Sequence, residues 1–95
     1  MTMKRESTVE GAVCKWARDN GLLVLKLGSP NDRGKPDRVF LSGGRTAFIE
    51  FKAKGKKPAR LQWMWIKKLR EAGFSASWCD NANEGIEFLR ESFSL

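Results

Sequence analysis

Two acidic residues and one lysine stand where neighbouring strands would bring them together. Asp37 follows Pro36 at the start of a predicted strand, and Glu50 and Lys52 share one face of the next strand, since side chains alternate along it. Paired carboxylates repel unless a cation lies between them, and oxygen ligands favour a hard ion such as Mg²⁺ or Mn²⁺. Such an ion activates water and neutralises phosphate charge, so the trio predicts phosphodiester hydrolysis, with Lys52 orienting the water or neutralising the same charge.

The composition excludes several other kinds of chemistry. The chain has no histidine and only two cysteines, Cys14 and Cys79, so it can form neither a four-ligand zinc site nor a histidine-based triad. We expect both cysteines to be buried, reduced thiols without a functional role. A net charge of +7 predicts a polyanionic partner, with nucleic acid ahead of a membrane surface. Charge alone favours DNA and RNA equally.

The length and the hydropathy pattern predict one small cytoplasmic domain. The 95 residues allow one hydrophobic core, so we expect a single domain over residues 1–95. The longest apolar run, in residues 21–25, is far too short to span a membrane. The first residues contain no apolar segment of the kind that a secretory signal needs.

Periodicity and turn residues predict the element order αβββαβα, an α/β fold. Helices are expected over 7–20, 58–72 and 84–92, and strands over 22–27, 37–41, 46–53 and 74–79, with a hairpin turn at 42–45. We expect the first strand to be buried on both faces for most of its length. The second helix is expected to bury one stripe, formed by Leu61, Met64, Trp65, Lys68 and Leu69.

On these elements the chain resembles the PD-(D/E)XK nuclease superfamily. The matching residues are Pro36-Asp37 and Glu50-Phe51-Lys52, and the longer pattern adds Arg33-Gly34-Lys35, Gly43-Gly44, Phe48-Ile49, Gln62, Trp65 and Gly73. This longer pattern is similar to the VRR-NUC family, in the stand-alone form found in phage and bacteria, over nearly the whole chain. The resemblance implies a restriction-endonuclease-like αβββαβ core, in which helices flank a central mixed sheet, plus a C-terminal helix. It also places the protein in the cytoplasm of a bacterium or a phage-infected host.

The resemblance implies a role for each residue of the trio. Asp37 and Glu50 would ligate Mg²⁺ or Mn²⁺ together with the backbone carbonyl of Phe51, and Lys52 would be the catalytic lysine.

Two further residues match positions of the family. Glu10 matches a helical acid that binds the metal directly or through water, while its capping-box spacing from Ser7 offers a purely structural explanation. Gln62 matches a glutamine that hydrogen-bonds near the reacting phosphate.

Kinship with Holliday-junction resolvases implies a homodimer that cuts four-way DNA junctions. The alternatives are a nuclease for flaps, nicks or generic duplex DNA, and a non-catalytic basic module that only binds nucleic acid. Basic residues near the trio would contact the DNA backbone: Lys35, Lys54, Lys56, Lys57 and Arg60. Trp63 lies off the predicted helix stripe and would serve either base stacking or a subunit interface.

Overall fold

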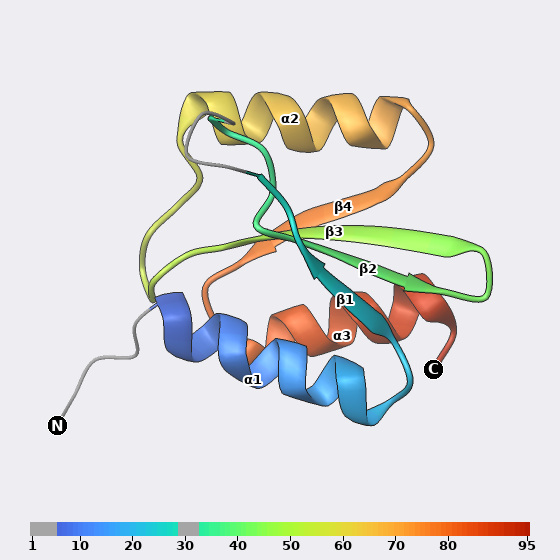
Figure 1. Cartoon of the computed structure of the whole chain (residues 1–95). Coiled ribbons are helices and arrows are strands. Elements are labelled where there is room, and N and C mark those ends of the chain that lie inside the picture. The colour runs from blue at the N-terminus through green and yellow to red at the C-terminus, as the bar shows by residue number, and fades with distance from the viewer. Residues whose placement is uncertain (1–5, 29–32) are drawn as a thin grey trace, which may run out of the picture.

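The computed structural model describes residues 6–28 and 33–95 and contains the seven predicted elements in the predicted order (Figure 1). The elements are α1 (Glu6–Asp19), β1 (Leu23–Lys26), β2 (Arg38–Ser42), β3 (Arg45–Phe51), α2 (Arg60–Glu71), β4 (Ser75–Cys79) and α3 (Ala82–Phe93). The predicted α/β fold class is therefore confirmed. The capping-box prediction for the Ser7 side chain lies outside the described residues.

The four strands form one mixed sheet in the order β1-β2-β3-β4. The first three strands are antiparallel, and the tight turn between β2 and β3 needs Gly43 and Gly44, whose φ angles are 55° and 77°. Strand β4 runs parallel to β3, so a crossover is required, and α2 supplies it. Figure 1 shows α2 on one face of the sheet and α1 with α3 on the other.

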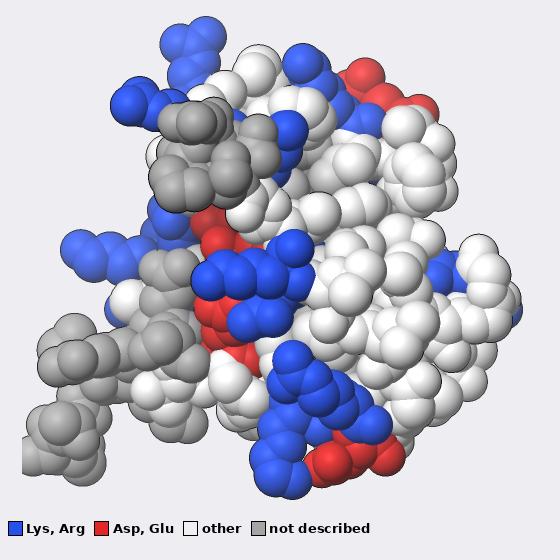
Figure 2. All heavy atoms as spheres, viewed as in Figure 1, with Lys and Arg blue, Asp and Glu red and all other residues white. Residues whose placement is uncertain are grey.

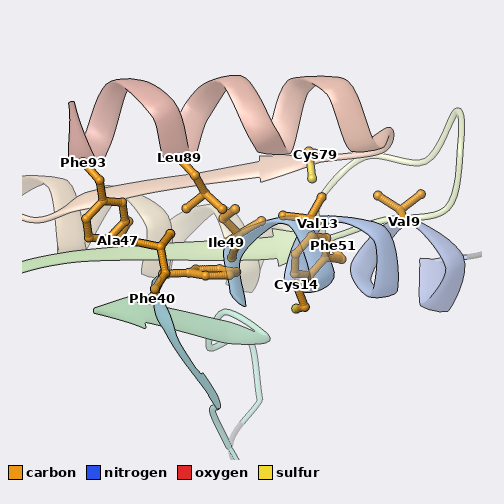
Figure 3. Packing of buried hydrophobic residues seen from close by; sticks show 12 residues of the cluster. Val9, Val13, Cys14, Phe40, Ala47, Ile49, Phe51, Cys79, Leu89 and Phe93 are labelled. Carbon is orange, nitrogen blue, oxygen red and sulfur yellow. The ribbon is translucent and has the colours of Figure 1, made fainter. Parts of the chain in front are cut away.

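The hydrophobic core lies between the sheet and the pair α1 and α3 (Figure 3). From β3, Ala47, Ile49 and Phe51 all face this layer and are buried, as the alternation along that strand predicts. Gly85 allows α3 to approach α1, because a Cβ atom there would lie 2.8 Å from Val13 Cγ2. The core thus holds one face of β3 rigidly in place.

Both cysteines belong to this core and are free thiols, as predicted. Burial raises the pKa of Cys14, and it raises the pKa of Cys79 to about 12. Thiols with a raised pKa form little of the reactive thiolate, which agrees with a packing role. Within the described residues, no helix is long and apolar enough to cross a membrane.

The predicted burial of the first strand is wrong. Leu23 and Leu25 are 65% and 51% exposed, and Val24 alone of the three packs against the core. The cause is topological, because β1 is an edge strand and α2 packs against β4, at the opposite edge of the same face. An apolar run cannot distinguish this place from the middle of a sheet.

The predicted stripe of the second helix is also wrong in part. Leu61 and Met64 are exposed, and the fully buried residue of α2 is Ile66. Gln62 and Leu69 flank Ile66 at helical spacing, and both are half-buried. The face of α2 toward the sheet therefore contains the polar residue Gln62. Apolar spacing alone does not predict a polar residue at such a position.

Candidate active site

The carboxylate of Asp37 is attached to the end of β3 by a backbone hydrogen bond. Asp37 immediately precedes β2, and Arg38 pairs with Ile49, so Asp37 reaches the strand end that carries Glu50, Phe51 and Lys52. The Phe51 N–H donates to Asp37 Oδ2 at 2.7 Å. The hairpin register thus brings together the two acids that are 13 positions apart in the sequence.

Glu50 is a buried acid that is held by the second helix. The residue is only 3% exposed, and Gln62 Nε2 donates to Glu50 Oε2 at 2.6 Å. Lys52 Nζ lies 3.7 Å from the same oxygen. Gln62 Oε1 accepts a hydrogen bond from the Ala59 N–H at 2.8 Å, so one side chain caps α2 and fixes the carboxylate. This double contact explains why a polar residue lies on the inner face of α2.

Negative charge is unfavourable at this site in the absence of a cation. Burial raises the pKa of Asp37 above its usual value, and the nearby Glu10 raises it further. The Phe51 N–H, the Lys52 ammonium and a side-chain hydrogen bond with Glu50 lower the same pKa, but burial is the larger effect. A divalent cation between the acids would supply the missing positive charge.

Glu10 reaches the edge of this arrangement from α1, but it is engaged by a different residue. Arg38 Nε donates to Glu10 Oε2 at 2.5 Å, and both side chains are largely buried. A role for Glu10 in metal binding stays a prediction. Arg38 was not among the predicted site residues, although its alternation with Phe40 along β2 places it on the α1 face.

The donor set fits a magnesium-type ion. In the part of the chain that the structure describes, no group of three or more His, Cys, Asp or Glu side chains is placed to hold a metal. Mg²⁺ is commonly held by one or two carboxylates together with water and substrate phosphate, so Asp37 and Glu50 suffice as the protein carboxylates. All of these donors are oxygens, as is the backbone carbonyl of Phe51.

Basic side chains surround the acidic site. Figure 2 shows acidic side chains gathered between α1 and α2, with Lys and Arg side chains above and below them. The ammonium of Lys35 lies over the Trp65 ring, 5.5 Å from its centroid. The turn before α2 is braced by a hydrogen bond from the Gly55 N–H to Asp80. Three basic side chains of this turn and one at the start of α2 are exposed: Lys54, Lys56, Lys57 and Arg60. Such a rim around buried acids suits a phosphate backbone.

Comparisons with known proteins connect this architecture to nucleases. No protein-family model matches the chain. The phage protein "Putative nuclease p44" of Acyrthosiphon pisum secondary endosymbiont phage 1 is 40% identical over 63 residues, which cover 65% of this chain and 68% of that protein. A solved structure described as "VRR_NUC domain" has a TM-score of 0.80 at 22% identity and covers 93% of this chain and 97% of its own. Another, "VRR_NUC domain protein", has a TM-score of 0.81 at 15% identity, with 98% and 91% covered.

Proposed function

The chain belongs to the VRR-NUC family of nucleases, and from this premise we propose that it is a divalent-metal-dependent, structure-selective DNA endonuclease. The observation that carries the proposal is the meeting of Asp37, Glu50 and Lys52 at one end of the hairpin, within a basic rim. We propose that residues 1–95 act as one nuclease domain. These features together favour hydrolysis of a phosphodiester over binding alone.

Each side chain of the site has a distinct task in this proposal. Asp37 and Glu50, with the Phe51 carbonyl, would hold Mg²⁺ or Mn²⁺, which when bound acidifies water and neutralises charge on the phosphate. Gln62 keeps the Glu50 carboxylate in one orientation through its 2.6 Å hydrogen bond. Lys52 emerges from the same face of β3 as Glu50, where its ammonium can orient a water or neutralise a phosphate oxygen.

Glu10 would act as an auxiliary acid. Its carboxylate is close enough to Asp37 to raise the pKa of that residue, so it adds negative charge to the site. Arg38 balances this charge through its hydrogen bond to Glu10. In this proposal Glu10 binds the cation directly or through water.

The preferred substrate in this proposal is a four-way DNA junction, cut by a homodimer. One small domain with one site cuts one strand, whereas resolving a junction requires two symmetric cuts. A two-fold dimer would match the symmetry of the junction.

The test compares one protein on four substrates of matched sequence. A labelled four-way junction, a flap, a nicked duplex and an intact duplex are incubated with Mg²⁺, Mn²⁺ or EDTA. Three variants accompany the wild type: Asp37→Ala, Glu50→Ala and Lys52→Ala. Lys15→Ala is the matched control, because Lys15 is an exposed lysine on α1 that pairs with Asp19, away from the site.

We expect paired symmetric cuts in the junction, which EDTA abolishes. The three site variants should reduce cleavage by about 100-fold or more while binding is retained, and Lys15→Ala should cut normally. Cleavage of every substrate would retain the nuclease and remove the junction preference. Binding without cleavage under both metals, or wild-type cleavage by the site variants, would overturn the proposal.

A further inference from the structure

Trp63 is a partly exposed indole that the proposed catalytic arrangement does not use. It is 37% exposed on α2, and its ring packs edge-to-face against Trp78 of β4, with the centroids 6.3 Å apart and the planes at 75°. This contact holds the Trp63 ring in place before any ligand arrives. A pre-ordered aromatic ring loses little conformational freedom on binding, which makes it a favourable contact surface.

Two independent structural links place this aromatic pair next to the active site. Trp78 is the register partner of Glu50 in the parallel β3–β4 pair, and neighbouring strands are roughly 4.8 Å apart. Trp63 directly follows Gln62, whose amide donates to Glu50. A nucleotide beside the phosphate that is cut would therefore come within reach of Trp63.

The surroundings of Trp63 are suited to a polyanion. A hollow of about 460 Å³ along α2 is lined by Arg60, Trp63, Met64, Lys67, Lys68 and Glu71. Three of these side chains are cationic and one is acidic, so the net charge of the lining is positive. Ligand sites commonly measure about 300–1,000 Å³, so the hollow has room for a nucleobase.

We propose that Trp63 is a stacking platform for an unpaired nucleobase next to the phosphate that is cut. The cations of the hollow, Arg60, Lys67 and Lys68, bind the flanking phosphates. This inference rests on the proposed DNA cleavage at Asp37 and Glu50, and it supplies a physical origin for structure selectivity. Bases with a free face occur at flaps, at gaps and at the open centre of a four-way junction, where stacking is interrupted, but not inside intact duplex, so a stacking contact discriminates between these substrates.

A second copy of this chain fits the hollow less well. Each copy carries a net charge of +7, and two such hollows facing each other would oppose their own cations. The positive charge of the residues that line the hollow therefore favours nucleic acid as the occupant.

The experiment measures binding in EDTA, so that cleavage plays no part. Two labelled DNA probes are used: a duplex with a short gap that leaves a few thymidines of the continuous strand unpaired, and a fully paired duplex of equal length. Wild-type protein is compared with Trp63→Ala and Trp63→Phe by fluorescence anisotropy over a range of salt concentrations. Trp16→Phe is the control, because Trp16 lies on α1 with the Arg90 guanidinium over its ring.

We expect Trp63→Ala to bind the gapped probe about 10- to 100-fold more weakly, while binding to the paired duplex changes less than about twofold. Trp63→Phe keeps an aromatic face and should retain most of the affinity. The salt dependence should stay unchanged in both, whereas Lys67→Ala should reduce its slope by about one unit.

Equal losses on both probes would overturn the proposal, as would unchanged binding of the gapped probe by Trp63→Ala. A loss that accompanies dissociation of a dimer, seen by sedimentation, would assign Trp63 to a subunit interface and overturn it as well. Circular dichroism checks folding, and Trp63→Phe keeps the test valid if the alanine variant unfolds. Because cleavage is assayed separately, failure of this inference leaves the proposed nuclease activity standing, and loss of cleavage with retained gap-specific binding would be recognised as failure of the nuclease proposal instead.

Discussion

At the C-terminal end of β3 the two faces of the strand carry opposite kinds of side chain. Ala47, Ile49 and Phe51 face α1 and α3 and are buried in an apolar layer. Glu50 and Lys52 face the other way, where Gln62 of α2 is the neighbour of Glu50. The end of β3, with Lys52 directly after it, therefore contributes to both the core and the candidate site.

This difference shows how a small protein can position buried charge. The apolar face fixes the backbone of β3, so the polar face inherits a fixed geometry without contributing much packing itself. Burial also raises the pKa of Asp37, which meets the end of β3 from the start of β2, so a negative charge there is unfavourable until a cation binds. Stability and proposed activity should thus separate between neighbouring residues of one strand.

The largest expected effect is a difference between two neighbours: substitution of Phe51 should lower stability, and substitution of Lys52 should lower cleavage. Phe51→Ala removes a fully buried ring from the core and should lower the free energy of unfolding by about 3–5 kcal/mol. Lys52→Ala should reduce cleavage by about 100-fold or more and change stability far less, because its side chain keeps some contact with solvent. Urea unfolding and junction cleavage at a temperature where both variants are folded measure the two effects.

Phe51→Leu is the control for size, since it keeps an apolar side chain and should lose much less stability than the alanine variant. If Phe51→Ala retained wild-type stability, or if Lys52→Ala unfolded as readily as Phe51→Ala, the separation between the two faces would be wrong.

A smaller effect is expected at Gln62, which both caps α2 and holds the Glu50 carboxylate. Gln62→Ala removes the acceptor for the Ala59 N–H and the donor to Glu50. Loss of the cap should lower the free energy of unfolding by about 1 kcal/mol. Because the Glu50 carboxylate is then no longer held in one orientation, half-maximal cleavage should require a higher metal concentration. A merely structural residue would lower stability without changing this metal dependence.

Asn83→Ala is the matched control for Gln62→Ala, because Asn83 is an exposed amide in the first turn of α3, remote in sequence from the site. It should leave both the free energy of unfolding and the metal titration unchanged. A Gln62→Ala variant with a wild-type metal titration would contradict the positioning role.

The sequence was sufficient for the order of elements and for the meeting of the acids. Period-two alternation in 46–53 separates Ile49 from Glu50, and the Gly43-Gly44 turn sets the register that carries Asp37 to the end of β3. These features are local, so they are visible in a single chain.

The errors concern features that depend on the position of one element against another. The exposure of Leu23 and Leu25 follows from the edge position of β1 and from the place where α2 packs, and neither is encoded in that segment. The bond between Arg38 and Glu10 joins residues 28 positions apart, across the sheet and α1. Pairing of this kind is set by tertiary packing, which residue spacing does not reveal.

The smallest expected effect concerns the unfavourable negative charge of Asp37 in the folded protein. Burial raises the pKa of Asp37 in the folded state, so the folded protein binds this proton more tightly than the unfolded chain does. The stabilisation that protonated Asp37 contributes is therefore fully present below the ordinary pKa of an aspartate, and it is lost as the pH rises through the raised value. Asp37→Asn removes the titrating group but keeps an oxygen that can accept from the Phe51 N–H.

In EDTA, Asp37→Asn should therefore unfold at a higher temperature than the wild type at neutral pH, and the advantage should shrink as pH falls toward 4. Mg²⁺ should raise the melting temperature of the wild type and not that of the variant, since the proposed site would hold the cation through both acids only in the wild type. Asp19→Asn, at an exposed carboxylate on α1, should change stability by less than about 0.5 kcal/mol. A variant less stable than the wild type at neutral pH without metal would mean that the Asp37 carboxylate stabilises the fold, and the candidate site would then contribute to stability as the apolar face of β3 does.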